Sequence, residues 1–172
     1  MATYTSRYPR TRRRTDDMVR KVRSIIDDAG INYLSITGRA KSPASFSDKV
    51  ARRASELGHT DFDPALDITD QVGVRIITYV HSDIEPVAQL LAENFTVLED
   101  RDMGRETASE GRFGYASRHM LISNDPSATA YDAAQCMSVQ LRTVLQHAWA
   151  EFEHDARYKG DVPAEFAHEL DR

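Results

Sequence analysis

Ile68-Thr-Asp-Gln-Val-Gly-Val-Arg-Ile-Ile-Thr-Tyr-Val80 is the stretch of this 172-residue chain that most strongly predicts its fold. From Val72 onward it is rich in β-branched residues and has polar residues on both sides, a pattern typical of a buried strand. Asp70 stands at the entrance of this strand and Arg75 inside its apolar run. A charge in a buried strand is costly unless it has a partner. The two charges therefore indicate either an internal ion pair or a ligand site, with Asp70 on a metal and Arg75 on an anion or a flat ring.

Hydrophobic periodicity on both sides of this stretch predicts a single α/β (or α+β) domain over residues 1–172. A mixed β-sheet of about five strands is expected to be flanked by helices. The expected helices cover residues 15–29, 43–57, 84–94, 144–157 and, as a short one, 164–170. The expected strands cover residues 31–37, 72–80, 95–102, 115–122 and 135–143.

Two details of this expectation concern the ends of the chain. Residues 1–14 look like a polar lead-in, in which Arg12-Arg13-Arg14 either begins a solvated helix or contacts a phosphate. Near the other end, one face of the last strong helix is expected to point inward, with these residues: Leu145, Ala148, Trp149 and Phe152.

Composition favours a soluble, cytoplasmic protein. No apolar run approaches the length of a membrane span, and the first residues lack the apolar core of a secretory signal. The single cysteine, Cys136, has no internal disulfide partner. The net charge of −5 argues against a general nucleic-acid-binding module, but residues 7–53 hold most of the excess arginine and lysine. This uneven distribution indicates a localised anion site.

The helix over residues 43–57 is a candidate for that site. Ser42 is a suitable N-cap, and Arg39 and Lys41 come just before it. One polar face of the helix, at positions i, i+4 and i+7, is made by Ser45, Lys49 and Arg52. Together with the positive end of the helix dipole, these cations suit a polyphosphate. The alternative for Lys49 and Arg52 is an ordinary solvated helix face.

Two later strands carry polar side chains at alternate positions. Period two puts Tyr115, Ser117 and His119 on one face, where they are suited to stacking a base. On the strand over residues 135–143, the polar face consists of Ser138, Gln140 and Arg142. A strand with one wholly polar face must turn that face to a cleft or to solvent.

The last strong helix offers a second kind of site. His147, Glu151 and His154 are spaced at i, i+4 and i+7 and would suit zinc. Hydrogen-bonded structural histidines explain the same spacing and are the favoured interpretation.

Five ordered motifs make residues 31–159 resemble the synthetase domain of the RelA/SpoT family, the alarmone synthetases, in a small single-domain form. The motifs are Arg39-Ala-Lys-Ser-Pro with Ser45, Lys49 and Arg52; Asp70-Gln-Val-Gly-Val-Arg75; Gly114-Tyr-Ala-Ser-Arg-His119; Val139-Gln-Leu-Arg-Thr143; and Trp149 through Glu153-His154 to Arg157-Tyr-Lys159. The resemblance implies a fold similar to that of nucleotidyltransferases. It also implies transfer of the β,γ-pyrophosphate of ATP to the ribose 3′-hydroxyl of GDP, GTP or GMP.

The resemblance also implies roles for individual residues. Arg39 and Arg75 would sandwich adenine, and Asp70 would bind Mg²⁺ beside Ser138 and Gln140 at the catalytic centre. The ATP phosphates would be held by Lys41, Ser45, Lys49 and Arg52. The acceptor nucleotide would be bound by Arg101, Arg112, Tyr115, Ser117, His119 and Arg142.

The chain departs from the family pattern at two motif positions. Ser138 stands where the family has a glutamate that joins the aspartate on the metal and helps to activate the 3′-hydroxyl, and Ala116 stands where it has an arginine. A hydroxyl is a poor Mg²⁺ ligand and no general base at neutral pH. Three hypotheses therefore stay open: an active synthetase with a rearranged site, a catalytically silent relative that binds nucleotide or a partner, and a toxin-like enzyme acting on the tRNA 3′ end. A homo-oligomer is possible under each of them.

Overall fold

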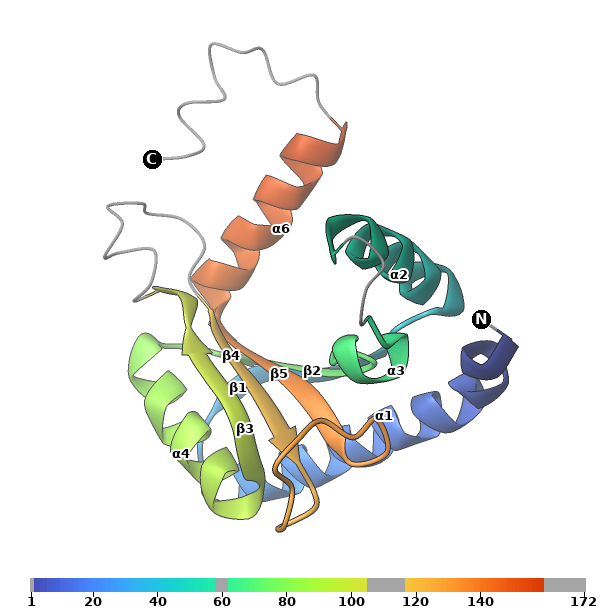
Figure 1. Cartoon of the computed structure of the whole chain (residues 1–172). Coiled ribbons are helices and arrows are strands. Elements are labelled where there is room, and N and C mark those ends of the chain that lie inside the picture. Colours follow the sequence, from blue (N-terminus) through green and yellow to red (C-terminus); the bar gives the residue numbers. More distant parts are fainter. Residues whose placement is uncertain (1, 58–61, 105–116, 160–172) are drawn as a thin grey trace.

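A five-stranded mixed sheet with helices on both sides forms the fold, as the computed structural model shows for residues 2–57, 62–104 and 117–159 (Figure 1). In chain order the strands are β1 (Tyr33–Ala40), β2 (Val72–Thr78), β3 (Thr96–Asp102), β4 (Arg118–Ser123) and β5 (Cys136–Thr143). The helices are α1 (Ala2–Asp28), α2 (Pro43–Leu57), α3 (Pro64–Asp67), η1 (His81–Asp83), α4 (Ile84–Asn94) and α6 (Val144–Lys159). The expected fold class is confirmed.

The strands lie in the order β1-β2-β5-β4-β3. Only β2 and β5 are paired in parallel, and the other three pairs are antiparallel. The stretch Ile68–Val80 therefore supplies β2, the strand between the edge strand β1 and the central strand β5. Arg75 of this strand lies beside Gln140, one of the alternating polar positions of β5.

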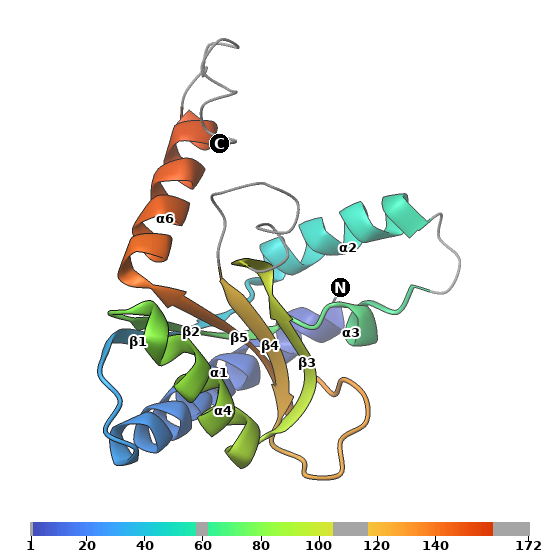
Figure 2. The ribbon, with the colours of Figure 1, turned by 90° about the vertical axis from the view of Figure 1, so that its left-hand side faces the viewer.

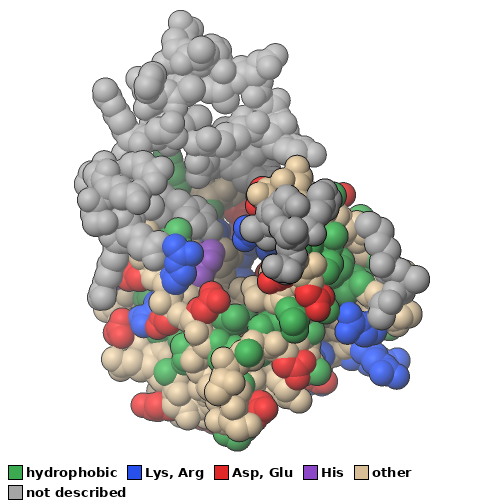
Figure 3. All heavy atoms as spheres, in the orientation of Figure 1, with side chains coloured by type: hydrophobic (Ala, Val, Ile, Leu, Met, Phe, Trp, Pro, Cys, Tyr) green, Lys and Arg blue, Asp and Glu red, His purple; other side chains and the backbone are tan. Residues whose placement is uncertain are grey.

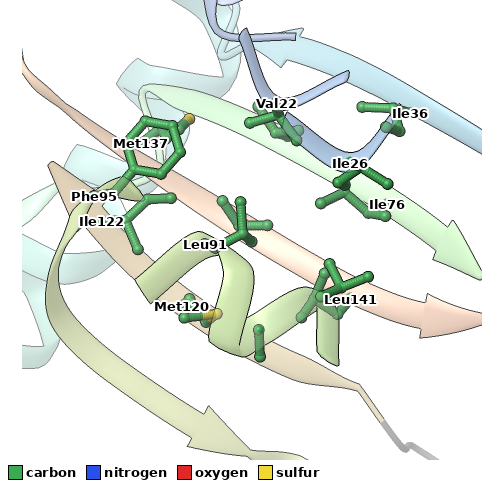
Figure 4. Close-up of a cluster of buried hydrophobic side chains, with 14 of the residues drawn as sticks. Val22, Ile26, Ile36, Ile76, Leu91, Phe95, Met120, Ile122, Met137 and Leu141 are labelled. Atoms are coloured by element: carbon green, nitrogen blue, oxygen red, sulfur yellow. The ribbon is translucent and has the colours of Figure 1, made fainter. Parts of the chain in front are cut away.

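The hydrophobic core fills the space between one face of the sheet and the helices α1 and α4 (Figures 2 and 4). Val22 and Ile26 from α1 and Leu91 from α4 are completely buried against strand residues such as Ile76 and Leu141. The opposite face of the sheet looks toward α2 and α6, which extend away from it (Figure 1). This face carries the polar positions of the strands.

Helix α1 is longer than the sequence predicts, and the expectation of a polar lead-in over residues 1–14 is wrong. The helix begins at Ala2 and continues through Pro9. Tyr4 provides the reason, because its ring stacks on Phe46 of α2 at 3.9 Å between centroids and its hydroxyl donates to the carbonyl of Lys41. This packing holds the first turns in place although their other residues are mostly polar.

The arginine cluster is divided by this helix. Arg12 and Arg13 are exposed, whereas Arg14 donates to the carbonyl oxygens of Ala133 and Cys136. Arg14 thus ties α1 to the segment before β5. This contact fits neither the phosphate contact nor the solvated helix start that the sequence suggests.

Several element boundaries differ from expectation by a few residues, and residues 64–67, which fall outside the expected helices, form α3. Residues 115 and 116 and the short helix expected over 164–170 lie outside the described residues.

The inward face expected for α6 is wrong, because Leu145, Trp149 and Phe152 have exposed fractions of 80%, 37% and 58%. No helix in the described ranges is long and apolar enough to cross a membrane.

Candidate functional site: a cationic cleft on the sheet

A cleft of about 920 Å³ lies on the polar face of the sheet. Of the residues that the sequence predicts to be functional, ten line it: Arg39, Lys41, Lys49, Asp70, Arg75, Arg101, His119, Ser138, Gln140 and Arg142. In the space-filling view, Lys or Arg side chains and a His side chain gather at a hollow in this face (Figure 3). The sheet thus brings together side chains that lie up to 103 positions apart in the sequence.

Strand register explains why these side chains meet. Thr37, Arg75, Gln140, His119 and Arg101 are successive partners across all five strands. Partners across a sheet point to the same face. Two residues further along each strand, and so on the same face, a second row of partners is formed by Arg39, Gly73, Ser138, Leu121 and Glu99. The two rows form the floor of the cleft.

Asp70 is held between two lysines at one end of this floor. Lys41 Nζ donates to Asp70 Oδ2 at 2.7 Å, and Lys49 Nζ donates to Asp70 Oδ1 at 2.9 Å. Burial raises the pKa of Asp70, but the hydrogen bonds from Lys41 and Lys49 outweigh it and the net pKa lies below its ordinary value. Asp70 is therefore an ionised carboxylate at neutral pH, within reach of the cleft.

The N-terminus of α2 positions one of these lysines. Ser42 is its N-cap as expected, because the backbone N–H of Ser45 donates to Ser42 Oγ at 3.1 Å. The Ser45 hydroxyl accepts from Ser42 Oγ at 3.0 Å and is not among the groups that line the cleft. In this structure Ser45 therefore takes part in the helix cap, and its predicted contact with the ATP phosphates stays a prediction.

Further along α2, the structure replaces one predicted cation by its neighbour. Arg53 lines the cleft, while Arg52 lies outside it with 68% of its side chain exposed. The prediction of Arg52 used its spacing from Ser45 and Lys49 on the helix. That spacing does not decide which of two neighbouring residues, Arg52 or Arg53, faces the cleft. Glu99, two residues before Arg101 on β3, also lines the cleft, although sequence analysis did not assign it.

Arg75 is held by partners on two other elements. Its Nε donates to Gln140 Oε1 at 3.3 Å, and its Nη1 donates to Glu151 Oε1 at 3.3 Å. Glu151 on α6 also lies 3.6 Å from His147 Nδ1. Arg75 thus has an ion-pair partner, but Glu151 is 59% exposed, so the pair is not the internal one that one interpretation of the strand expected. Its guanidinium still lines the cleft, as the other interpretation required.

The acceptor side of the prediction is only partly described. His119 lies in the cleft, and Ser117 is buried with its Oγ 2.7 Å from His119 Nε2. Arg142 is 4% exposed yet reaches the cleft from β5. Arg112 and Tyr115 lie outside the described residues, so their predicted contacts with the acceptor stay predictions.

The described residues do not assemble a multidentate metal centre. They hold no group of three or more His, Cys, Asp or Glu side chains placed to share an ion. Within the part of α6 that is described in atomic detail, His147 and Glu151 form an ordinary i, i+4 pair, and the side chain of His154 falls outside that part. The zinc hypothesis therefore gains no support from this geometry.

Fold and cleft together define an α/β protein with a cleft rich in lysine and arginine on the open face of its sheet. The chain belongs to the RelA/SpoT family, because residues 38–162 match the sequence model described as the region found in RelA / SpoT proteins.

Two relatives from Bacillus subtilis support this assignment. The chain is 28% identical over 141 residues to the GTP pyrophosphokinase YjbM and 31% identical over 136 residues to the GTP pyrophosphokinase YwaC. These matches cover 80% and 77% of this chain but span only 63% and 62% of the lengths of the relatives.

Solved structures agree with the fold. The small alarmone synthetase 2 from Bacillus subtilis superposes with a TM-score of 0.74 at 25% identity, covering 98% of this chain and 89% of that one. The small alarmone synthetase 1 from the same organism, in a structure bound to its product pppGpp, gives a TM-score of 0.68 at 24% identity, covering 94% and 84%.

Proposed function

We propose that this chain is a pyrophosphokinase that transfers the β,γ-pyrophosphate of ATP to the 3′-hydroxyl of GDP, GTP or GMP and so makes alarmones of the (p)ppGpp type. The family membership and the names of its relatives support this activity. The observation that carries the proposal is the placement of Asp70 between Lys41 and Lys49 inside the cleft. Transfer of a phosphoryl or pyrophosphoryl group depends chiefly on positioning and on neutralising charge, and this cluster provides groups for both.

Mg²⁺ fits the donor set around Asp70. Magnesium in nucleotide enzymes is held by one or two carboxylates and completed by water and substrate phosphates, not by an all-protein cage. Asp70 is ionised, lies in the cleft and is 37% exposed, so it suits this arrangement. Bound there, Mg²⁺ would neutralise charge on the phosphate oxygens. Lys41 and Lys49 would then exchange the carboxylate for the phosphates.

The donor nucleotide is proposed to lie over β1 and β2. Arg39 is a diagonal cross-strand neighbour of Arg75, because the register partner of Arg75 is Thr37. Diagonal neighbours on a sheet are about 7–8 Å apart, which suits two guanidinium planes on opposite faces of one aromatic ring. Arg53 then joins the two lysines on the phosphates.

The acceptor nucleotide is proposed to lie over β5, β4 and β3. The cations on that side of the cleft are Arg101 and Arg142, with His119 between them in the lining. Ser138 faces the same floor, and its hydroxyl is a weak base at neutral pH. The chain itself therefore contributes orientation and electrostatic stabilisation more than proton abstraction. Since both proposed substrates are cytoplasmic metabolites, the proposed reaction belongs in the cytoplasm.

Direct assay of product tests this proposal. Purified protein would be incubated with labelled ATP, Mg²⁺ and one guanosine nucleotide at a time, and the products separated by chromatography. Label is expected on the guanosine nucleotide, and the Asp70→Asn variant is expected to lose at least about 10²-fold in rate. Nucleotide binding in calorimetry without any transfer would instead favour the silent relative, and label on the 3′ end of added tRNA would favour the toxin-like enzyme.

A further inference from the structure

A line of hydrogen bonds crosses the floor of the cleft from its donor half to its acceptor half. Arg75 Nε donates to Gln140 Oε1 at 3.3 Å, and Gln140 Nε2 lies 3.2 Å from His119 Nε2. Ser117 Oγ lies 2.7 Å from the same imidazole nitrogen. The three polar links join β2, β5 and β4, whose residues Arg75, Gln140 and His119 are register partners.

The chemistry of the groups fixes the direction of each link. A guanidinium has only donors, so Gln140 must turn its amide oxygen toward Arg75. The amide NH₂ of Gln140 then faces His119, and it too can only donate. His119 Nε2 must therefore be an acceptor, which places the imidazole proton on Nδ1 and leaves the ring neutral. Nε2 then has a single lone pair, which the Gln140 NH₂ shares with the Ser117 hydroxyl when that hydroxyl rotates to donate.

We propose that Gln140 is a positioning residue that couples the orientation of Arg75 to the tautomer and protonation of His119. A proton on His119 Nε2 could be accepted by Ser117 Oγ at 2.7 Å, but it would also face the Gln140 NH₂ at 3.2 Å, and a turn of the amide would relieve that second contact. The turned amide would present NH₂ to Arg75 Nε and remove the acceptor that orients the guanidinium. By linkage, whatever orients Arg75 also favours the neutral imidazole, and the reverse holds equally.

Under the proposed function, on which this consequence rests, the coupling would join the two substrate sites. A nucleotide base stacked on Arg75 and an anion bound near His119 would each alter the affinity of the cleft for the other. The charged groups that line the same cleft as His119 from the described elements are Arg39, Lys41, Lys49, Arg53, Asp70, Arg75, Glu99, Arg101, Arg142 and Glu151. The carboxylates among them favour an imidazolium and the cations oppose it, and the cations outnumber the carboxylates by seven to three.

Nitrogen-15 NMR of the histidine rings tests the inference on the whole, ligand-free protein. The His119 signals, assigned with a His119→Asn variant, are expected to show a neutral ring with a bare Nε2 at pH 7. A His119 ring that carries its proton on Nε2 in the wild-type protein would overturn the inference, and this measurement needs no variant that must fold.

Two substitutions of Gln140 sharpen the test. Gln140→Glu replaces the NH₂ by an oxygen, so the carboxylate would favour a proton on Nε2. The titration midpoint of His119 is expected to rise by about one pH unit or more. Gln140→Leu is expected to release the tautomer, so that both neutral forms appear. Gln89→Leu, the same change on the exposed face of α4, is the matched control and should leave the His119 signals as in the wild type.

An unchanged midpoint in Gln140→Glu would contradict the coupling, provided that the variant unfolds at the wild-type temperature and its other histidine signals are unmoved. Because these spectra require no nucleotide, they succeed or fail independently of the transfer assay.

Calorimetry adds the functional readout: a mutual effect of a non-hydrolysable ATP analogue and GDP on each other's affinity is expected in the wild type and should be lost in Gln140→Leu. If both ligands bind but their affinities are independent in the wild type, the link between the two sites is refuted while the proposed activity stands.

Discussion

Lys49 Nζ lies 2.9 Å from Asp70 Oδ1, a contact that joins the middle of α2 to a residue two positions before β2. Lys41 completes the cluster from the other side of the carboxylate at 2.7 Å. The three side chains come from three separate segments, and their ion pairs fix where α2 stands over the sheet. The same contacts create the proposed phosphate site, so stability and function share these residues.

Acid stability should report the state of Asp70. Its pKa is depressed in the folded protein, so its contribution to stability is fully present above the unfolded value of about 3.9 and is lost as the pH falls through the folded value. Asp70→Asn should lower stability at pH 7 and flatten the part of the pH dependence below about pH 4. Urea unfolding of both proteins between pH 7 and pH 2 measures this. Parallel curves for the two proteins would show that the lysines do not stabilise the carboxylate.

Arg52 and Arg53 form a matched pair for testing the wall of the cleft. Both reach Glu56, at 4.0 Å and 3.3 Å, but only Arg53 also lines the cleft. Arg53→Ala should weaken binding of a non-hydrolysable ATP analogue about tenfold, the effect of one hydrogen bond to a charged group, and Arg52→Ala should leave it unchanged. Calorimetry on the two variants decides between the structure and the helix spacing, which had assigned Arg52.

Ser138→Glu tests whether the floor of the cleft tolerates a second acid. Position 138 lies between Gly73 and Leu121 in the register, and the glycine leaves space beside it. A carboxylate there can accept a proton, so transfer to the guanosine nucleotide should rise by about 10²-fold. A variant that folds and binds both nucleotides but transfers no faster would show that proton abstraction does not limit the rate.

Gly38 of β1 lies close against α1. A Cβ at this position would lie 2.6 Å from both Thr15 Cγ2 and Val19 Cγ2. Gly38→Ala should therefore destabilise the protein by about 1–3 kcal/mol, the usual cost of overpacking. Gly73→Ala is the matched control, because its Cβ would meet only the carbonyl of Arg39 at 3.5 Å and should change stability by less than about 1 kcal/mol. Equal losses in denaturant titrations of the two variants would contradict this difference.

Strand alternation explains why so much of the cleft is visible in the sequence. The polar positions of β5, at Ser138, Gln140 and Arg142, follow a period of two, so they share one face of the strand while the apolar positions between them are buried on the other. Register then brings Arg75, Gln140 and His119 into one row, although no sequence pattern states which strands are neighbours.

Helix faces are less predictable, for two physical reasons. Successive helix residues are rotated by about 100°, so whether Arg52 or Arg53 faces the cleft depends on where the sheet lies relative to α2. The spacing of residues within the helix does not give that position. On α6, apolar spacing predicts a buried stripe, yet the helix extends from the sheet and leaves Leu145 and Phe152 largely exposed. Amphipathic spacing indicates that a face can be buried, not that this chain buries it.

The stacking of Tyr4 on Phe46 has a practical consequence for anyone who trims this protein for crystallisation or assay. The first turns of α1 look dispensable, since they are polar and precede the family segment. Yet deleting them removes the Tyr4 ring that stacks on Phe46 near the N-terminus of α2, and with it the hydroxyl that donates to the carbonyl of Lys41. A shortened version would keep every side chain of the cleft. The segments that carry Lys41 and Lys49 would nevertheless lose the packing and the hydrogen bond that Tyr4 supplies.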